Sequence, residues 1–184
     1  TSPDVGMDFS INPYQGCEHG CTYCYARNSH EYWGYSAGID FEQKILVKEN
    51  AVELLKQKFE SKNWKPMAIT LSGNTDCYQP IERKLKMTRK LIEVFHEYKN
   101  PLGIITKNAL IQRDIDILSD MARDRLVKVA ISITTLNEDL RRKMEPRTAT
   151  IKQRLETVEK LTHAGIYVGV MMAPIIPGLT SNEI

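Results

Sequence analysis

The apolar residues of this chain fall into short continuous runs separated by stretches with helical spacing. Continuous runs of this length predict buried strands, which we expect at residues 9–12, 44–47, 67–71, 103–106, 126–132 and 166–172. Apolar residues recur every three or four positions over 51–59, 84–99, 112–124 and 151–161, which predicts helices there. Residues 28–44 are aromatic but show no clear period.

Capping residues support two of these helices. Asn50 is a candidate cap for the helix that starts at Ala51. Thr150 and Gln153 have the spacing of a capping box, and Gly165 is placed to end the same helix.

Alternating strands and helices imply a parallel sheet with helices packed outside it. We therefore expect an α/β fold, with residues 1–184 forming a single domain. Five strand–helix units are clear, and Thr180 or Ser181 resembles the cap of a helix that has barely begun. The sequence thus predicts a domain that is incomplete at its C-terminus. Polar residues follow several strands, which is where (β/α) barrels place their active sites.

Composition narrows the possible functions without identifying one. The net charge is +2, which does not favour binding to nucleic acid or to an anionic membrane. No apolar run approaches the ~20 residues that a membrane span needs. No signal-peptide pattern opens the chain, and its cysteines do not suggest a disulfide framework. We therefore expect a cytoplasmic protein that does not enter a membrane.

Three of the four cysteines form the most informative motif, Cys17-x3-Cys21-x2-Cys24. Gly16 and Gly20 precede two of them and allow the backbone to fold tightly around a bulky group. Three thiolates are one too few for a closed tetrahedral site. A [4Fe-4S] cluster bound by three cysteines keeps one iron without a protein ligand, and a small molecule could bind there.

Two other uses of these cysteines remain open at this point. A zinc site could use the same three thiolates with His19 or His30 as the fourth ligand, although zinc ligands usually come as two separated pairs. An iron–sulfur electron carrier is a third possibility, but carriers normally complete the cluster with four protein ligands.

The motif, with the aromatic Tyr23 just before Cys24, resembles the radical S-adenosylmethionine (SAM) superfamily. The resemblance implies a partial (β/α) barrel, usually of six strands, of which this chain would supply about five units. It also implies that SAM chelates the open iron and is cleaved reductively to a 5′-deoxyadenosyl radical, which takes hydrogen from a substrate. A reductase such as flavodoxin or ferredoxin would supply the electron. Tyr23 would lie near the adenine, and Tyr25 or Tyr14 would shield the cluster.

The same resemblance suggests which residues after the strands hold SAM. The segment with Ser72, Gly73, Asn74 and Asp76 stands where the family binds the SAM amino group, although it departs from the usual Gly-Gly-Glu-like pattern. Lys107 is a candidate partner for the SAM carboxylate.

Three further residues are candidates on the same grounds. Arg154 is a second candidate for the carboxylate, Ser132 for the ribose or methionine part, and Pro174 for an apolar wall beside the adenine.

Within the superfamily, these segments look most like the branch related to spore photoproduct lyase, whose members repair a thymine dimer in DNA. Those enzymes use a cysteine near the end of the second strand as a hydrogen donor. Cys77 lies in that segment of this chain, displaced by several residues, with Gly73 closer to the matching place. Cys77 is therefore a candidate hydrogen donor or else a small buried residue. The substrate and the reaction outcome are not indicated by the sequence.

Overall fold

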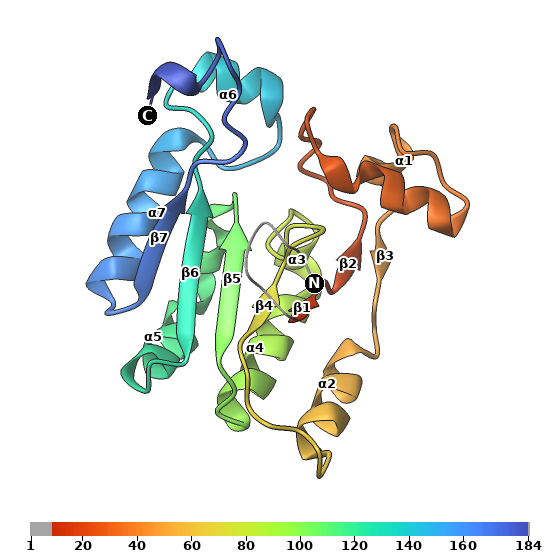
Figure 1. Cartoon of the computed structure of the whole chain (residues 1–184), viewed down its shortest axis with the longest axis vertical. Coiled ribbons are helices and arrows are strands. Elements are labelled where there is room, and N and C mark those ends of the chain that lie inside the picture. Colours follow the sequence, from red (N-terminus) through yellow and green to blue (C-terminus); the bar gives the residue numbers. More distant parts are fainter. Residues whose placement is uncertain (1–8, 184) are drawn as a thin grey trace.

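The computed structural model describes residues 9–183 and contains a five-stranded parallel sheet (Figure 1). The strand order is β1-β4-β5-β6-β7. The strands of this sheet are β1 (Phe9–Ile11), β4 (Ile69–Leu71), β5 (Leu102–Thr106), β6 (Val127–Ser132) and β7 (Tyr167–Met171). In the register, Leu71 lies beside Ile104, and Ser132 lies beside Met171. The segments that leave the strands therefore meet along one edge of the sheet.

Most helices run between successive strands and cover the outside of the sheet, while residues 14–47, after β1, form a separate lobe (Figure 1). The α-helices are α1 (Asp40–Gln43), α2 (Ala51–Glu60), α3 (Glu82–Leu85), α4 (Met87–Glu97), α5 (Ile115–Arg123), α6 (Glu138–Met144) and α7 (Ile151–His163). The 3₁₀ helices are η1 (Tyr25–Trp33), η2 (Ala109–Asp114) and η3 (Ser181–Glu183). In the lobe, β2 (Tyr14–Gln15) pairs antiparallel with β3 (Leu46–Val47).

The main hydrophobic core lies between the sheet and helices α2, α4, α5 and α7. Leu71 and Ile104 of the central strands pack there with Leu91 and Phe95 of α4 and Leu118 of α5, and each is at most 1 % exposed. Alternate residues of β5 are buried, so the other face of that strand is left for the opposite side of the sheet. This core makes the sheet a rigid support for the loops at its edge.

The structure confirms the expected α/β fold and every expected strand to within a few residues. The capping box of Thr150 and Gln153 is present, and Gly165 follows the end of α7 with a positive φ of 78°. The side chain of Asn50, in contrast, makes no capping hydrogen bond to α2. That part of the prediction was wrong.

The helix expected over residues 84–99 is broken, because Lys86 adopts a left-handed backbone conformation with φ of 54°. The buried carboxylate of Glu82 accepts the backbone N–H of Thr88 at 3.0 Å, which gives α4 its own N-terminal partner. Helix α6 and strand β2 were not predicted, since both are short. No helix in residues 9–183 has the length and apolar character needed to cross a membrane.

Candidate functional site

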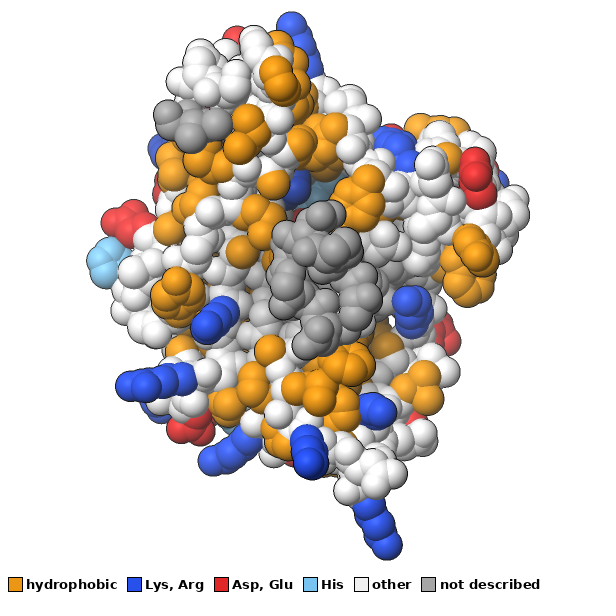
Figure 2. All heavy atoms as spheres, in the orientation of Figure 1, with side chains coloured by type: hydrophobic (Ala, Val, Ile, Leu, Met, Phe, Trp, Pro, Cys, Tyr) orange, Lys and Arg blue, Asp and Glu red, His pale blue; other side chains and the backbone are white. Residues whose placement is uncertain are grey.

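A cavity of about 610 Å³ opens where the cysteine-containing loop meets the ends of the parallel strands. On the face shown in Figure 2, hydrophobic side chains border a hollow with basic and histidine atoms inside it. The loop contributes Cys17, His19, Cys21, Tyr23, Cys24 and Tyr25. The segments around the strand ends contribute Ser72–Asp76, Ile105–Lys107, Ser132, Met171, Ala173, Pro174 and Ile176.

All three motif cysteines line this cavity, and all three are free thiols. Cys17 is buried, and Cys21 and Cys24 are partly exposed. Burial raises the pKa of the Cys21 thiol to about 12, and it raises the pKa of Cys17 as well. Binding to iron or zinc would remove these protons, because a metal stabilises the thiolate directly.

Two glycines shape the loop that carries the cysteines. Gly16 and Gly20 have φ values of 85° and 66°, a region that favours glycine. A Cβ atom on Gly20 would lie 2.1 Å from the Arg147 guanidinium, so this position also lacks space for a side chain. A residue with a side chain at Gly16 or Gly20 would therefore be strained in this loop conformation.

His19, between the first two cysteines, is 2 % exposed and has partners at both ring nitrogens. Its Nδ1 lies 3.4 Å from the Asp76 carboxylate, and its Nε2 lies 3.1 Å from the Asn108 side-chain amide. Burial lowers the pKa of His19 despite the nearby carboxylate of Asp76. The ring therefore links the cysteine loop to the segments after β4 and β5.

These contacts weigh against the zinc alternative with His19 as a ligand. Within residues 9–183, no group of three or more His, Cys, Asp or Glu side chains is arranged to hold a metal ion. His30, the other candidate, is fully buried against Tyr35 and Phe41 and does not line the cavity. A cluster of four irons is larger than one ion and suits thiolates that are spread around a cavity wall.

Lys107 supplies a cationic side chain on the cavity wall, as expected. Its Nζ lies 5.9 Å from the centre of the Tyr23 ring, within the range of a cation–π contact. Among the described residues, no carboxylate forms an ion pair with it. Lys107 is therefore available to an anionic group bound in the cavity.

The four candidates between residues 72 and 76 also line the cavity, but their polar groups are partly engaged. The Asp76 carboxylate accepts hydrogen bonds from the Thr106 hydroxyl and from the Lys107 backbone, both at 2.7 Å. The Ser72 hydroxyl accepts the Cys77 N–H at 3.0 Å. Asp76 thus holds the strand ends together, which leaves it less free to bind a ligand than the sequence suggested.

Ser132 and Pro174 lie on the cavity wall as well. Ser132 is 1 % exposed at the end of β6, where its carbonyl oxygen accepts from Arg154. Together with Ile105, Met171 and Ile176, Pro174 makes this side of the cavity mostly apolar.

Arg154 has a different environment from the expected one. Its side chain is 1 % exposed and does not line the cavity. The guanidinium forms an ion pair with Glu145 at 2.5 Å and donates to the carbonyl oxygens of Ser132 and Ala149. These buried partners occupy the donors that a SAM carboxylate would need, so the structure corrects the prediction that Arg154 binds it.

Cys77 also lies away from the cavity, in the main hydrophobic core, where it is fully buried. Burial raises the pKa of its thiol well above the usual value. A hydrogen donor must meet the substrate radical, and this position does not allow it. Tyr14, expected to shield the cluster, is likewise buried, and its hydroxyl donates to Glu82.

Tyr25 lines the cavity from a more exposed position. Its side chain is 78 % exposed, and its hydroxyl donates to the Gly73 carbonyl oxygen, which joins the cysteine loop to the end of β4. Sequence reasoning missed this contact and also the segment 144–147, which touches the loop from the other side. The motif Glu145-Pro146-Arg147 offered no signal beyond its charges.

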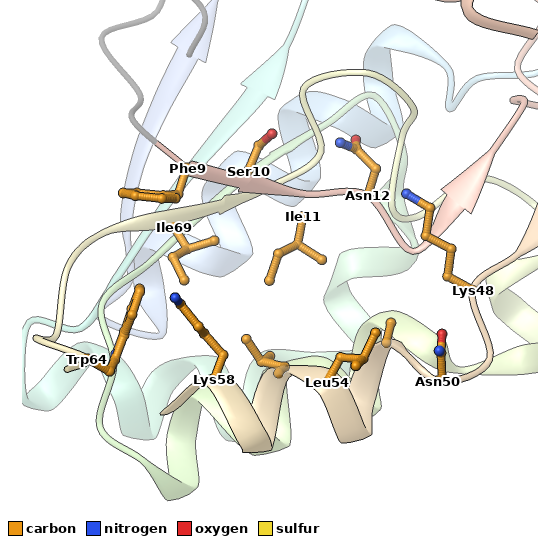
Figure 3. Close-up of a pocket in the computed structure, with 12 residues that line it drawn as sticks. Phe9, Ser10, Ile11, Asn12, Lys48, Asn50, Leu54, Lys58, Trp64 and Ile69 are labelled. Atoms are coloured by element: carbon orange, nitrogen blue, oxygen red, sulfur yellow. The ribbon is translucent and has the colours of Figure 1, made fainter. Parts of the chain in front are cut away.

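A second hollow of about 380 Å³ lies between β1 and α2 and carries no comparable chemistry. Figure 3 shows Ile11 and Ile69 pointing toward α2, which contributes Leu54 and Lys58, with Phe9 and Trp64 at one end. Its cationic residues are Lys48 and Lys58, and Lys58 lies over the Trp64 ring at 5.3 Å. Without a thiol, an acid or a histidine in its lining, this groove is a less suitable place for catalysis than the cysteine cavity.

Several known proteins are similar to this chain in sequence or in fold. An uncharacterised protein from Mycobacterium tuberculosis is 33 % identical over 174 residues, which cover 95 % of this chain and 51 % of the relative. Spore photoproduct lyase complexed with dinucleoside spore photoproduct has a similar fold, with a TM-score of 0.70 and 19 % identity over 96 % of this chain and 48 % of the lyase. The chain spans about half the length of these proteins.

A more distant structure shares the fold. Native anSMEcpe with bound AdoMet and a Cp18Cys peptide has a TM-score of 0.56 and 17 % identity, covering 88 % of this chain and 41 % of that protein. The sequence pattern of the Radical SAM superfamily matches residues 11–184, which include the three cysteines and every strand end at the cavity. The chain belongs to the radical SAM superfamily.

Proposed function

We propose that Cys17, Cys21 and Cys24 hold a [4Fe-4S] cluster at the cavity and that SAM binds beside it. Members of the superfamily are enzymes that use these two cofactors. The observation that carries the proposal is the position of the three free thiols on the wall of one cavity, at the ends of parallel strands. When bound, the cofactors supply one-electron cleavage of SAM to a 5′-deoxyadenosyl radical, which abstracts hydrogen from substrate.

The residues present fit both groups. Three soft thiolate donors suit iron and leave one iron open, and the His19 and Asp76 side chains on the same cavity wall are engaged with each other at 3.4 Å. The backbone of the glycine-containing loop can approach a bulky cluster closely. The remaining cavity has one cationic side chain, hydroxyl groups and an apolar side, which match the carboxylate, the ribose and the adenine of SAM.

Each cavity residue has a simple task in this proposal. Lys107 pairs with the SAM carboxylate, and Tyr23 contributes an aromatic surface beside the third cysteine. Ser72, Gly73, Asn74 and Asp76 border the amino group, and Ser132 and Pro174 face the nucleoside. The apolar side of the cavity excludes water, which protects a reactive radical from side reactions.

Anaerobic reconstitution with iron and sulfide tests the cofactor assignment. We expect a coloured protein whose dithionite-reduced EPR signal changes when SAM is added, because SAM would ligate the open iron. Formation of 5′-deoxyadenosine should accompany this change. A colourless protein with stoichiometric zinc would support the binding-module alternative, and a cluster indifferent to SAM would support the electron carrier. Either result would overturn the proposal.

Lys107→Met tests the carboxylate contact. A charge-assisted hydrogen bond is worth about 1.5–3 kcal/mol, so we expect SAM to bind roughly 10- to 100-fold more weakly. Isothermal titration of the reconstituted protein would measure this. Lys128→Met is the matched control, since Lys128 is an exposed lysine of β6 outside the cavity. Equal SAM affinities of the two variants would contradict the role of Lys107.

The proposal extends to the whole protein only in outline. We propose that residues 1–184 form one radical SAM core domain in the cytoplasm and receive an electron from a flavodoxin or ferredoxin. A lyase reaction on a thymine-derived lesion would follow the branch resemblance, but the solved structures of this fold include a complex with a dinucleoside spore photoproduct and one with a peptide. The fold is therefore compatible with different substrate classes, and we assign none.

A further inference from the structure

The segment Met144–Arg147 forms hydrogen bonds with four residues of the cysteine loop, which lie on both sides of Cys21. The Met144 carbonyl oxygen accepts the Thr22 N–H at 2.9 Å. The Arg147 backbone N–H donates to the His19 carbonyl oxygen at 3.3 Å. The Arg147 guanidinium donates to the Glu18 carbonyl oxygen and pairs with Glu42. These contacts fix the loop backbone on both sides of Cys21.

Glu145 extends this arrangement to a side chain of the cavity wall. One carboxylate oxygen pairs with the buried Arg154, and the other accepts the Tyr23 hydroxyl and the Thr134 hydroxyl, the latter at 2.8 Å. Glu145 itself is fully buried and does not line the cavity. Its effect on the cavity therefore passes through Tyr23. This residue precedes Cys24 in the sequence, and its ring lies next to the Lys107 side chain.

These contacts restrict the rotation of the Tyr23 side chain, which lies on the loop between Cys21 and Cys24. A tyrosine on a loop can normally rotate about two side-chain bonds. Here its hydroxyl is bound to a carboxylate that is itself held by Arg154, so both ends of the ring are fixed. A preorganised wall binds a ligand more tightly because less ordering is needed on binding.

We infer that Met144–Arg147 positions the cysteine loop, and that Glu145 acts as a positioning residue which sets the orientation of Tyr23 for binding of SAM. The inference rests on the proposed function, since SAM is the ligand concerned. It assigns to Glu145 and Arg147 a role that the motif itself does not indicate.

Tyr23→Phe is the most direct test, because it removes the hydroxyl and keeps the ring. Thr134 still donates to Glu145 in this variant, so the carboxylate keeps a partner. We expect normal iron and sulfide content after reconstitution, but SAM binding weakened by roughly three- to tenfold, because the freed Tyr23 ring must be ordered when SAM binds. In the apo protein, iodoacetamide should alkylate Cys21 and Cys24 faster than in wild type, because the loop is less ordered.

Tyr32→Phe is the matched control, since Tyr32 lies in η1 and is 94 % exposed. Both its SAM affinity and its alkylation rate should equal those of wild type. Gly20→Ala adds a second probe, because the new Cβ would displace the Arg147 guanidinium. Gly34 has a similar φ of 76° and open space around it, so Gly34→Ala controls for backbone strain alone.

The outcomes separate this inference from the proposed function. If wild-type protein takes up no cluster or binds no SAM, the proposed function fails first. If wild type binds SAM, and Tyr23→Phe matches Tyr32→Phe in both SAM affinity and alkylation, the positioning role is wrong. Faster unfolding or lower stability alone would not support it, because loss of a purely structural contact would also change stability.

Discussion

Cys21→Ala is expected to abolish assembly of a stable cluster. Cys21 lies at the cavity wall with Cys17 and Cys24, and a three-cysteine site that loses one ligand cannot hold the cluster with one iron left open. After anaerobic reconstitution, we expect iron and sulfide content to fall close to background. The change of the EPR signal on adding SAM should be lost with it.

Cys77→Ala controls for the loss of a thiol as such. Cys77 is in the hydrophobic core and not in the cavity, so its replacement should leave iron content and the response to SAM unchanged. Wild-type iron content in Cys21→Ala, or equal losses in both variants, would refute the assignment of the cluster ligands. Circular dichroism of both proteins would show whether either loss comes from unfolding.

Glu145→Gln is expected to cause the largest loss of stability. It leaves Arg154 buried with an uncompensated charge, and breaking a buried ion pair costs about 3–5 kcal/mol in free energy of unfolding. Urea unfolding at neutral pH would measure this loss. Glu156→Gln on α7 is the control, since Glu156 pairs with Lys152 at 4.0 Å near the surface and should change stability by less than about 1 kcal/mol.

The same pair predicts a dependence on pH. Burial acts to raise the pKa of Glu145, but the Arg154 guanidinium and then Lys107 hold it below the usual value for glutamate. Because the folded-state pKa is lowered, the contribution to stability is present above the unfolded pKa of about 4.3 and is lost as the pH falls through the folded value. Stability of wild type should therefore fall towards that of Glu145→Gln in acid. Parallel curves from pH 7 to pH 3 would exclude this explanation.

Features determined by neighbouring residues could be predicted from the sequence. The cysteine motif and its positive-φ glycines lie within one short loop, so their roles can be judged from local sequence. The strands can be predicted because each is a continuous apolar run. The position of Lys107 followed from topology, since the ends of parallel strands meet at one edge. The break at Lys86 was missed because it depends on a side-chain contact. The Glu82 carboxylate accepts the Thr88 N–H at the start of α4, and such a contact leaves no periodic pattern in the sequence.

Arg154 shows why the remaining site residues could not be predicted. An arginine near a barrel mouth suits a carboxylate equally well whether that carboxylate belongs to a ligand or to the protein. The structure supplies Glu145 as the partner, and this pairing depends on how α7 packs against the segment after α6. Cys77 is similar, because the direction of its side chain depends on the turn after β4 and not on its place in the sequence.

The contact between Arg147 and Glu18 joins residues that are 129 positions apart, which affects the order of events during synthesis. At 5–20 residues per second, the cysteines leave the ribosome roughly ten seconds before Arg147 is made. During that interval the loop lacks the partners that give it its final form, and its thiols are open to oxidation or to other metals. Stable insertion of a cluster therefore belongs after folding of the later strand–helix units, even though its ligands are among the first residues made.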